Sequence, residues 1–565
     1  RAMMRALGNA LLLAGFASGL AAQTTSPAQN PTKQQAAAGP YSISGTVLGA
    51  TTGTPLDRAE VTLSTAGQQS TQLATVTTTD TGVFRFDHLA AGKYTLDASR
   101  RGYIAAGYQE HEGFVTAIVT GPDLDGQDLR LPLFPEGVLS GAVTDDSGDP
   151  VGGAQVSLYR QLQENGISHI ATANSAVTDD TGTYEFSRLR PGDYYISVAA
   201  TPWYGFHPRP RTDGSGNPLP SDQQPHSPLD VAYSTTFYPN ATDSASAAPI
   251  TINAGDRVQA NVSLHAVPAV HIRIQIPAPV PGRSFAMPQL RTEAFGTEHF
   301  QPTPIFQATQ TSVDGQRGTM TVEIGGIAPG HYDLGEFGPQ GELRGGSVDL
   351  TTSQTLEFKP AAGATDVSGR LAMASGRKLA EGLDAILVPS GNQGRPIGAR
   401  VSADGTFDFP SVASGSYEFQ VHAFSRSIAV AQMAASAGQV EGSHITVGTD
   451  PVLLAATLVT GSVTVNGYAQ SDGKGIGGVM ILLIPRQPGA SHELYRRDQS
   501  DSDGSFALSR VIPGDYTLVA IENGWTLDWG RPEVMAAYLA HGLAVHVPDQ
   551  QGPLSIPAPV AVQPR

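Results

Sequence analysis

A sequence frame that recurs along the 565-residue chain limits its fold more than any other feature. In the clearest copy, a turn ending at Gly182 is followed by Tyr184, Phe186 and Leu189, and a second turn then leads to Tyr194. Large apolar residues therefore stand 2, 4 and 7 positions after the turn glycine, and a tyrosine stands 12 positions after it. Alternation of this kind indicates β-strands joined by tight turns.

The same frame occurs elsewhere in one register. Complete copies begin at Gly82, Gly182, Gly405 and Gly504, and a degraded copy, with Met320 in place of the glycine, ends at Tyr332. Repetition at this spacing is the signature of a tandem array, in which each repeat is one structural unit. Alternating strands within units of about 90 residues close best as two-sheet sandwiches. The sequence therefore predicts an all-β chain of five sandwich domains.

Composition agrees with this fold and excludes several functions. The chain has 64 glycines and 41 prolines but only 15% charged residues, which favours a turn-rich β protein. Its net charge of -17 is spread along the chain and disfavours nucleic acid, which needs basic patches. The absence of cysteine excludes disulfides, thiolate metal sites and cysteine nucleophiles.

Residues 1–22 have the pattern of an export signal. Arg1 and Arg5 form a basic start, an apolar run extends from Leu7 to Leu20, and small residues follow. A membrane-spanning helix is the alternative, but the run is short for the ~20 residues that a bilayer requires. We therefore expect an exported protein (periplasmic, outer-surface or extracellular) with no transmembrane anchor after signal removal. Residues 23–40 lack periodicity and are expected to form a disordered linker.

The frame and the repeated strand that opens each unit divide the rest of the chain. The predicted domains are 41–133, 134–266, 267–359, 360–449 and 450–560. The second carries an insertion at 203–248, the third is the most divergent, and the fifth includes a short helix near 532–540. Short junctions that contain proline favour a semi-rigid string, so an arc or rod is expected.

The frame resembles the carboxypeptidase regulatory-like domain, a transthyretin-like (prealbumin-like) Greek-key β-sandwich related to Cna B-type repeats and carbohydrate-binding-like modules. The motif that the copies share, D-x-G-x-[FY]-x-F-x-x-L-x-x-G-x-Y, underlies this resemblance. The order of units also resembles secreted bacterial envelope proteins built from such domains in tandem. The resemblance implies a fold and an exported location but no single activity.

No catalytic or metal constellation is recognisable in the sequence. None of the 14 histidines has a glutamate three residues later, and His111-Glu112 and His492-Glu493 lack the second histidine of a zincin helix. The lysine that an isopeptide cross-link needs is missing from the clear first strands. Calcium binding by the aspartate-rich turns at 145–149 and 498–504 is left open, because carboxylates are calcium ligands but also favour turns for backbone reasons alone. We therefore expect no enzyme activity, no catalytic residues, no metal and no cofactor.

Aromatic residues in loops give the functional signal. Nine residues after the frame tyrosine stand Tyr103, Trp203 and Trp525, each just past a strand. Flat aromatics exposed on loops stack on sugars or bind protein partners, and the alternative is that they cap their own sandwich. The candidate ligand-binding residues are Trp203, Tyr204, Phe206, Phe237, Tyr238, Tyr103, Tyr108, Trp525 and Trp529. The insertion is expected to form the principal surface.

Three functions follow from these features. The first is a non-catalytic protein of the cell envelope that binds carbohydrate or a surface. The second is a structural spacer or adhesion stalk, and the third is an accessory subunit of an outer-membrane or proteolytic complex. The expected partner is a glycan or an envelope protein. An open aromatic surface would favour the first function, a featureless polar surface the second and a large apolar patch the third.

Overall fold

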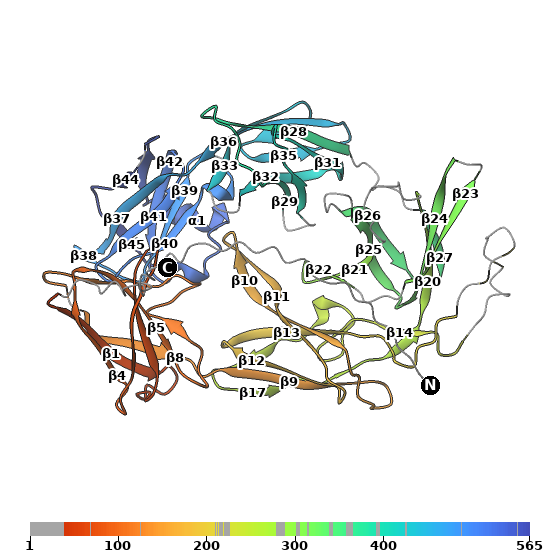
Figure 1. Ribbon diagram of the computed structural model, residues 1–565, viewed down its shortest axis with the longest axis horizontal. Coiled ribbons are helices and arrows are strands. Elements are labelled where there is room, and N and C mark those ends of the chain that lie inside the picture. The colour runs from red at the N-terminus through yellow and green to blue at the C-terminus, as the bar shows by residue number, and fades with distance from the viewer. Residues whose placement is uncertain are drawn as a thin grey trace, which may run out of the picture.

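The structure, a computed structural model, describes residues 39–565 apart from short gaps. The gaps are 68, 125, 209–210, 212, 214–218, 220–226, 278–288, 301–304, 314–315, 338–342, 358–364, 391–395, 424–426, 488 and 551. The predicted export signal and nearly all of the predicted linker lie outside the described residues. The described chain consists of strands with one α-helix and a few 3-10 turns (Figure 1).

The strands form sandwich units that share one pairing plan. In each unit the opening strand pairs antiparallel with the strand of the sequence frame and parallel with a strand near the end of the unit. The other sheet of each unit is built on an antiparallel pair between an early strand of the unit and the strand that contains the frame tyrosine. We number the units one to five in chain order.

Units one and two have the clearest two-sheet arrangement. The sheets of unit one contain β4 (Val83–Leu89), β1 (Tyr41–Gly49) and β8 (Gly126–Leu133), opposite β3 (Gln72–Thr77), β2 (Glu60–Thr65), β5 (Gly92–Ser99), β6 (Ala106–Gly107) and β7 (Ile118–Thr120). Those of unit two contain β12 (Thr183–Leu189), β9 (Gly137–Thr144), β17 (Arg257–Gln259) and β18 (Val262–Ser263), opposite β11 (Ile167–Val177), β10 (Gln155–Glu164), β13 (Gly192–Ala199), β15 (Thr236–Phe237) and β16 (Ile250–Ile252). A small ladder of β14 (Val231–Tyr233) and β19 (Ala266–Pro268), and the 3-10 turn η2 (Ser244–Ser246), lie beside unit two.

Units three and four repeat the two-sheet plan. The sheets of unit three contain β23 (Ile305–Val313), β24 (Gln316–Ile327), β20 (Val270–Pro277) and β27 (Gln354–Glu357), opposite β22 (Thr297–Phe300), β21 (Gln289–Ala294), β25 (Gly330–Phe337) and β26 (Leu343–Leu350). Those of unit four contain β31 (Thr406–Val412), β28 (Thr365–Met373), β36 (Val452–Thr460) and β33 (Ile428–Ala435), opposite β30 (Ile397–Arg400), β29 (Leu383–Pro389), β32 (Gly415–Ala423), β35 (His444–Val447) and β34 (Gln439–Glu441).

In unit five one strand joins the two sheets. β45 (Val560–Gln563) pairs with both β37 (Val463–Ser471) and β42 (Gly514–Ile521). The other strands are β38 (Lys474–Gly475), β39 (Met480–Pro485), β40 (Arg496–Gln499), β41 (Ser505–Val511), β43 (Leu543–Val547) and β44 (Gly552–Ser555). The 3-10 turns η4 (His492–Leu494) and η5 (Gly524–Thr526) precede α1 (Pro532–Leu539), the helix expected near 532–540, which begins at its proline.

Each unit encloses its own group of buried apolar side chains. Alternate residues of the paired strands supply them, for example Phe84 and Phe86 in unit one and Phe407 and Phe409 in unit four. The all-β fold class and the sandwich units are thereby confirmed. The division into five independently folding domains at the predicted boundaries stays a prediction.

The frame tyrosine has one structural role in every unit. Its hydroxyl donates to the carbonyl oxygen four residues upstream, across the turn between two strands, at 2.6–3.0 Å. The pairs are Tyr94 with Ala90, Tyr194 with Arg190, Tyr332 with Ala328, Tyr417 with Ala413 and Tyr516 with Ile512. A buried hydroxyl needs a hydrogen-bond partner. Because the partner is always the carbonyl four residues upstream, the tyrosine keeps a constant number of residues from the preceding turn in every copy of the frame.

The frame glycine of unit two is expected to be irreplaceable. Gly182 has φ +74°, and a Cβ there would lie 2.6 Å from the Val143 carbonyl oxygen. Gly182→Val should therefore destabilise unit two by at least ~1 kcal/mol, seen as a lower melting temperature. Gly148→Val is the control, because Gly148 has φ +82° but nothing within 4 Å. An equal decrease in melting temperature in the two variants would contradict a steric clash at Gly182.

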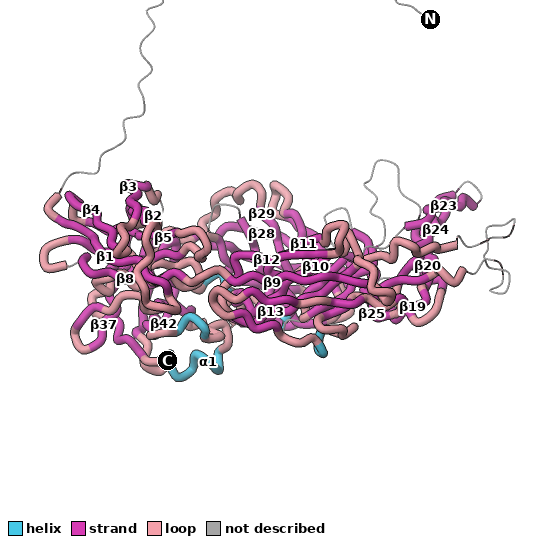
Figure 2. Tube along the Cα trace, turned by 90° about the horizontal axis from the view of Figure 1, so that it is seen from below, coloured by secondary structure: helices cyan, strands magenta, loops and turns pink. Residues whose placement is uncertain are grey.

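The fifth unit returns to the first, so the string of units closes on itself. Figure 1 shows the chain running from unit one in red through green to unit five in blue, which lies beside unit one again. Figure 2 shows the same circuit edge-on as one band. We call the contact of residues 93–119 and 163–168 with residues 497–505 and 525–530 the closing contact.

Polar bonds in the closing contact join units one and five. Arg497 Nη1 donates to Glu112 Oε2 at 2.6 Å, and Lys93 Nζ lies 2.5 Å from Asp501 Oδ2. The amide of Gln499 donates to the Gln109 carbonyl at 2.7 Å and to Thr116 at 2.7 Å. Unit two adds the bond from the Gly530 amide to the Gly166 carbonyl at 2.8 Å. The predicted arc or rod is therefore wrong, since groups up to 412 residues apart bind one another.

Candidate functional site

The insertion of unit two places an aromatic turn on the surface. Gly205 donates its amide to the Pro202 carbonyl at 3.0 Å, so residues 202–205 form a tight turn with Trp203 and Tyr204 at its tip. The two rings lie edge to face with centroids 5.7 Å apart. Trp203 is 80% exposed, whereas Pro202 beneath it is buried. The turn therefore presents an indole to solvent from a fixed base.

Phe206 and Leu229 extend this surface. The Phe206 amide donates to the Leu229 carbonyl at 2.8 Å, so the two residues lie side by side although 23 residues separate them. Phe206 is 60% exposed and Leu229 47% exposed. We call Trp203, Tyr204, Phe206 and Leu229 the aromatic patch. Apolar side chains left this exposed next to one another are typical of a binding surface.

A histidine–aspartate–histidine bridge lies directly beside the patch. Asp230 Oδ1 lies 2.8 Å from His207 Nδ1, and Asp230 Oδ2 lies 2.7 Å from His271 Nε2. His271 belongs to β20 of unit three, so the bridge joins the insertion to the next unit. The patch is therefore fixed relative to two units.

The structure does not place the other predicted aromatics on this patch. Phe237 is buried with Tyr159 and Phe295 in the contact between units two and three. Tyr238 is half-buried against the core of unit two. Tyr103 and Tyr108 are half-buried against the core of unit one.

Trp525 and Trp529 correct the expectation of exposed loop aromatics, because both are buried. Trp525 stacks on His111 at 5.2 Å with the rings 4° from parallel. The Arg497 guanidinium lies 5.3 Å from the Trp529 ring, and Trp529 Nε1 donates to Gln163 at 3.1 Å. Trp525 follows the same spacing rule as Trp203, and Trp529 lies four residues further on, but units one and two cover both rings. They hold the closing contact and leave no face for a ligand.

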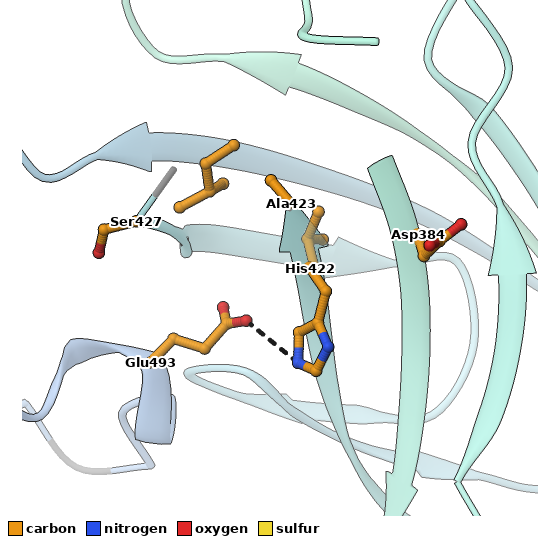
Figure 3. A pocket seen from close by; sticks show the side chains of 7 residues that line it. Asp384, His422, Ala423, Ser427 and Glu493 are labelled. Carbon is orange, nitrogen blue, oxygen red and sulfur yellow. Dashed lines mark ion pairs between the residues drawn. The ribbon is translucent and has the colours of Figure 1, made fainter. Parts of the chain in front are cut away.

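A cavity of about 520 Å³ lies between units four and five (Figure 3). Asp384 of β29, His422 of β32 and Glu493 of η4 line it together with Val421, Ala423, Ser427 and Ile428. His422 Nε2 lies 3.6 Å from Glu493 Oε1. Glu493 Oε2 is buried and has no hydrogen-bond partner among the described residues.

Burial dominates the electrostatics around this cavity. It raises the pKa of Glu493 to about 8, and the nearby negative charge of Glu418 adds to the shift. Burial alone would also raise the pKa of Glu418, but the hydrogen bond and charge of His492 lower it overall. His492 Nδ1 lies 2.8 Å from Glu418 Oε2, and this bond raises the pKa of His492. The Glu493 carboxyl therefore holds its proton to a higher pH than an ordinary glutamate, next to the hydrogen-bonded pair of Glu418 and His492.

Sequence reasoning missed three features of these sites. Leu229 and Asp230 carry no local signal, because only folding of the insertion brings them to Phe206 and His207. In the sequence, Glu493 is noted only because it follows His492, and this pair lacks the second histidine of a zincin helix. Its burial depends on unit four, whose residues 384 and 422 are distant in the chain.

Comparison with known families agrees with the fold. The sequence profile of the carboxypeptidase regulatory-like domain matches residues 42–117 and 138–217. The profile described as BOS complex subunit NOMO1-like, second beta sandwich domain, matches residues 458–538. No curated protein matches the chain. The described residues include no helix with the length and hydropathy required to cross a membrane.

Solved structures that resemble the chain include two streptococcal pilins and a Bacillus anthracis protein. GBS52, the minor pilin of Streptococcus agalactiae, is 18% identical, with 43% of this chain and 100% of that chain covered and a TM-score of 0.20. A streptococcal ancillary pilin is 10% identical over 57% and 100% of the two chains, with a TM-score of 0.18. The Bacillus anthracis TIE protein is 9% identical over 71% and 68%, with a TM-score of 0.14. Similarity at this level carries no argument about function. Together, the family profiles and the repeated sandwich plan show that the chain is a tandem β-sandwich protein with carboxypeptidase regulatory-like domains.

Proposed function

We propose that the chain is an exported, non-catalytic binding protein of the cell envelope that holds a carbohydrate on the aromatic patch. The observation that supports this most is the exposure of Trp203 in a chain with three tryptophans, of which the other two are buried. Flat rings bind the apolar faces of sugars by stacking, and an indole gives the largest contact. The tight turn at 202–205 holds the ring in place before a ligand arrives, which lowers the entropy cost of binding.

The arrangement of the units bears on the alternative functions. An extended spacer or stalk would need units in a row, whereas the closing contact brings unit five back to units one and two. An accessory subunit would bind a protein partner through the same patch. The glycan proposal is favoured over a protein partner because the exposed patch consists of few side chains, smaller than a standard protein interface.

The aromatic patch is tested by a double substitution. Trp203→Ala with Phe206→Ala should weaken glycan binding by roughly tenfold or more, since each stacked ring contributes ~0.5–1.5 kcal/mol beyond its buried area. Phe206 is chosen as the second position because it is 60% exposed, whereas the candidate Tyr238 is half-buried against the core. Titration of the best glycan from an array screen measures the effect.

Tyr468→Ala provides the matched control, since Tyr468 is a 49% exposed aromatic in unit five, away from the patch. It should leave binding unchanged. Equal affinity of the double variant and the native chain, at unchanged melting temperature, would remove the patch from consideration. A chain that binds no glycan but binds a purified envelope protein through Trp203 would favour the accessory-subunit function instead.

A further inference from the structure

The bridge between units two and three has the ligand chemistry of a metal site. Its members are His207, Asp230 and His271, whose nearest ligand atoms all lie within 4.8 Å of one another. Two imidazole nitrogens and one carboxylate oxygen are a common ligand set for zinc with one position left open. Within the described residues this is the one group of three such side chains that meets that distance.

Backbone pairing brings the three residues together from distant segments. β14 pairs with β19, and Ala269 donates its amide to the Asp230 carbonyl at 2.9 Å, so Asp230 lies next to the start of β20. The Phe206 amide bond to Leu229 places His207 beside Asp230. Asp230 lies 23 residues after His207 and 41 residues before His271, and neither spacing belongs to a sequence motif for metal binding. The site therefore exists only in the folded chain.

The neighbouring backbone makes room for the His207 ring. Gly326 of β24 has φ +67°, and a Cβ there would lie 2.5 Å from His207 Nε2. The His271 amide donates to Ser353 Oγ at 2.9 Å, which fixes the strand that carries the second imidazole. The side chains of His207, Asp230 and His271 are 9%, 20% and 17% exposed. The three ligand side chains are therefore held in place by the surrounding backbone and are largely shielded from solvent.

We propose that His207, Asp230 and His271 bind a divalent transition metal of the zinc class and thereby join units two and three. At bond lengths of about 2.0–2.1 Å, ligand atoms around tetrahedral zinc lie roughly 3.3 Å apart. At present Asp230 bonds each imidazole through a different oxygen, Oδ1 at 2.8 Å from His207 and Oδ2 at 2.7 Å from His271, so zinc bound by one of these oxygens would replace both hydrogen bonds. Two neutral imidazoles and one carboxylate carry a single negative charge, which suits a dication. Calcium and magnesium are disfavoured, because they prefer oxygen ligands.

Metal content of the purified chain tests the proposal. The tag-free chain is stripped with a chelator, incubated with zinc, passed through gel filtration and assayed for bound metal. We expect the native chain to retain one zinc, and His271→Gln and Asp230→Asn to retain none. His546→Gln is the matched control, since it removes an exposed histidine that pairs with Asp515 at 2.8 Å and should retain one zinc.

A second measurement keeps the proposal falsifiable if a variant folds poorly. Because a ligand that binds the folded state stabilises it, zinc should raise the melting temperature of the stripped native chain, and calcium or magnesium should not. The melting temperature of folded Asp230→Asn should not respond to zinc. A native chain that retains no zinc would overturn the proposal, as would variants that retain zinc in full.

Discussion

Replacing Arg497 by glutamate is expected to open the chain at the closing contact. The guanidinium lies 5.0 Å from the Phe114 ring, 5.6 Å from Trp525 and 5.3 Å from Trp529, and it bonds Glu112. The substitution removes the cation–π contacts and places a second carboxylate against Glu112. The side chains of Arg497 and Glu112 are 18% and 34% exposed, so loss of this pair and of the cation–π contacts costs about 2 kcal/mol, which shifts the equilibrium roughly thirtyfold towards the open form.

Solution scattering measures this opening directly. The native chain should give the dimensions of the closed circuit, and Arg497→Glu should increase both the radius of gyration and the longest dimension. The control is Arg85→Glu, which reverses the exposed pair of Arg85 with Asp87 at 2.8 Å in unit one and should leave the curve unchanged. Identical curves for the native chain and Arg497→Glu would contradict the closing contact.

Replacing Glu493 by glutamine should stabilise the chain at alkaline pH. The folded-state pKa is about 8, above the ordinary value of 4.5, so the folded form binds this proton more tightly than the unfolded form. Stability from this group is therefore complete below about pH 4.5, falls as the pH rises, and is lost above about pH 8. The shift sets an upper bound of about 5 kcal/mol. We expect about 2 kcal/mol, because the side chain stays 16% exposed.

The measurement is the difference in melting temperature between Glu493→Gln and the native chain across the pH range. This difference should rise between pH 4.5 and 8 and then stay constant. Melting temperatures are compared rather than a single free energy of unfolding, because chains of several domains seldom unfold in one step. Glu533→Gln serves as control, since that side chain is 70% exposed. A difference independent of pH would show that Glu493 is ionised throughout.

The strands of each sandwich could be predicted from the sequence because their signal is local. Phe84 and Phe86 alternate with polar residues, and the pattern alone requires one buried face. Tyr94 follows at a fixed distance because its hydroxyl reaches back four residues to Ala90. Both contacts involve neighbours in the chain, so their spacing is visible in the sequence.

The environment of the loop aromatics could not be predicted in the same way. Trp203 and Trp525 follow the same spacing after the frame tyrosine, yet one is exposed and the other is buried. The difference comes from His111 and Phe114, which cover Trp525 although they lie more than 400 residues before it in the chain. The bridge of His207, Asp230 and His271 likewise depends on strand pairing between separate segments.

The closing contact has a consequence for synthesis of the protein on the ribosome. Lys93 and Asp501 are 408 residues apart, so at ~5–20 residues per second roughly 20–80 s pass between the translation of the two partners. During that interval His111 and Phe114 of unit one lack the tryptophan that later covers them. Unit five of another chain offers the same tryptophan, so two nascent chains can exchange their last units and form a domain-swapped dimer with two closing contacts. The balance between self-closed monomer and swapped dimer then depends on how close together the chains are made.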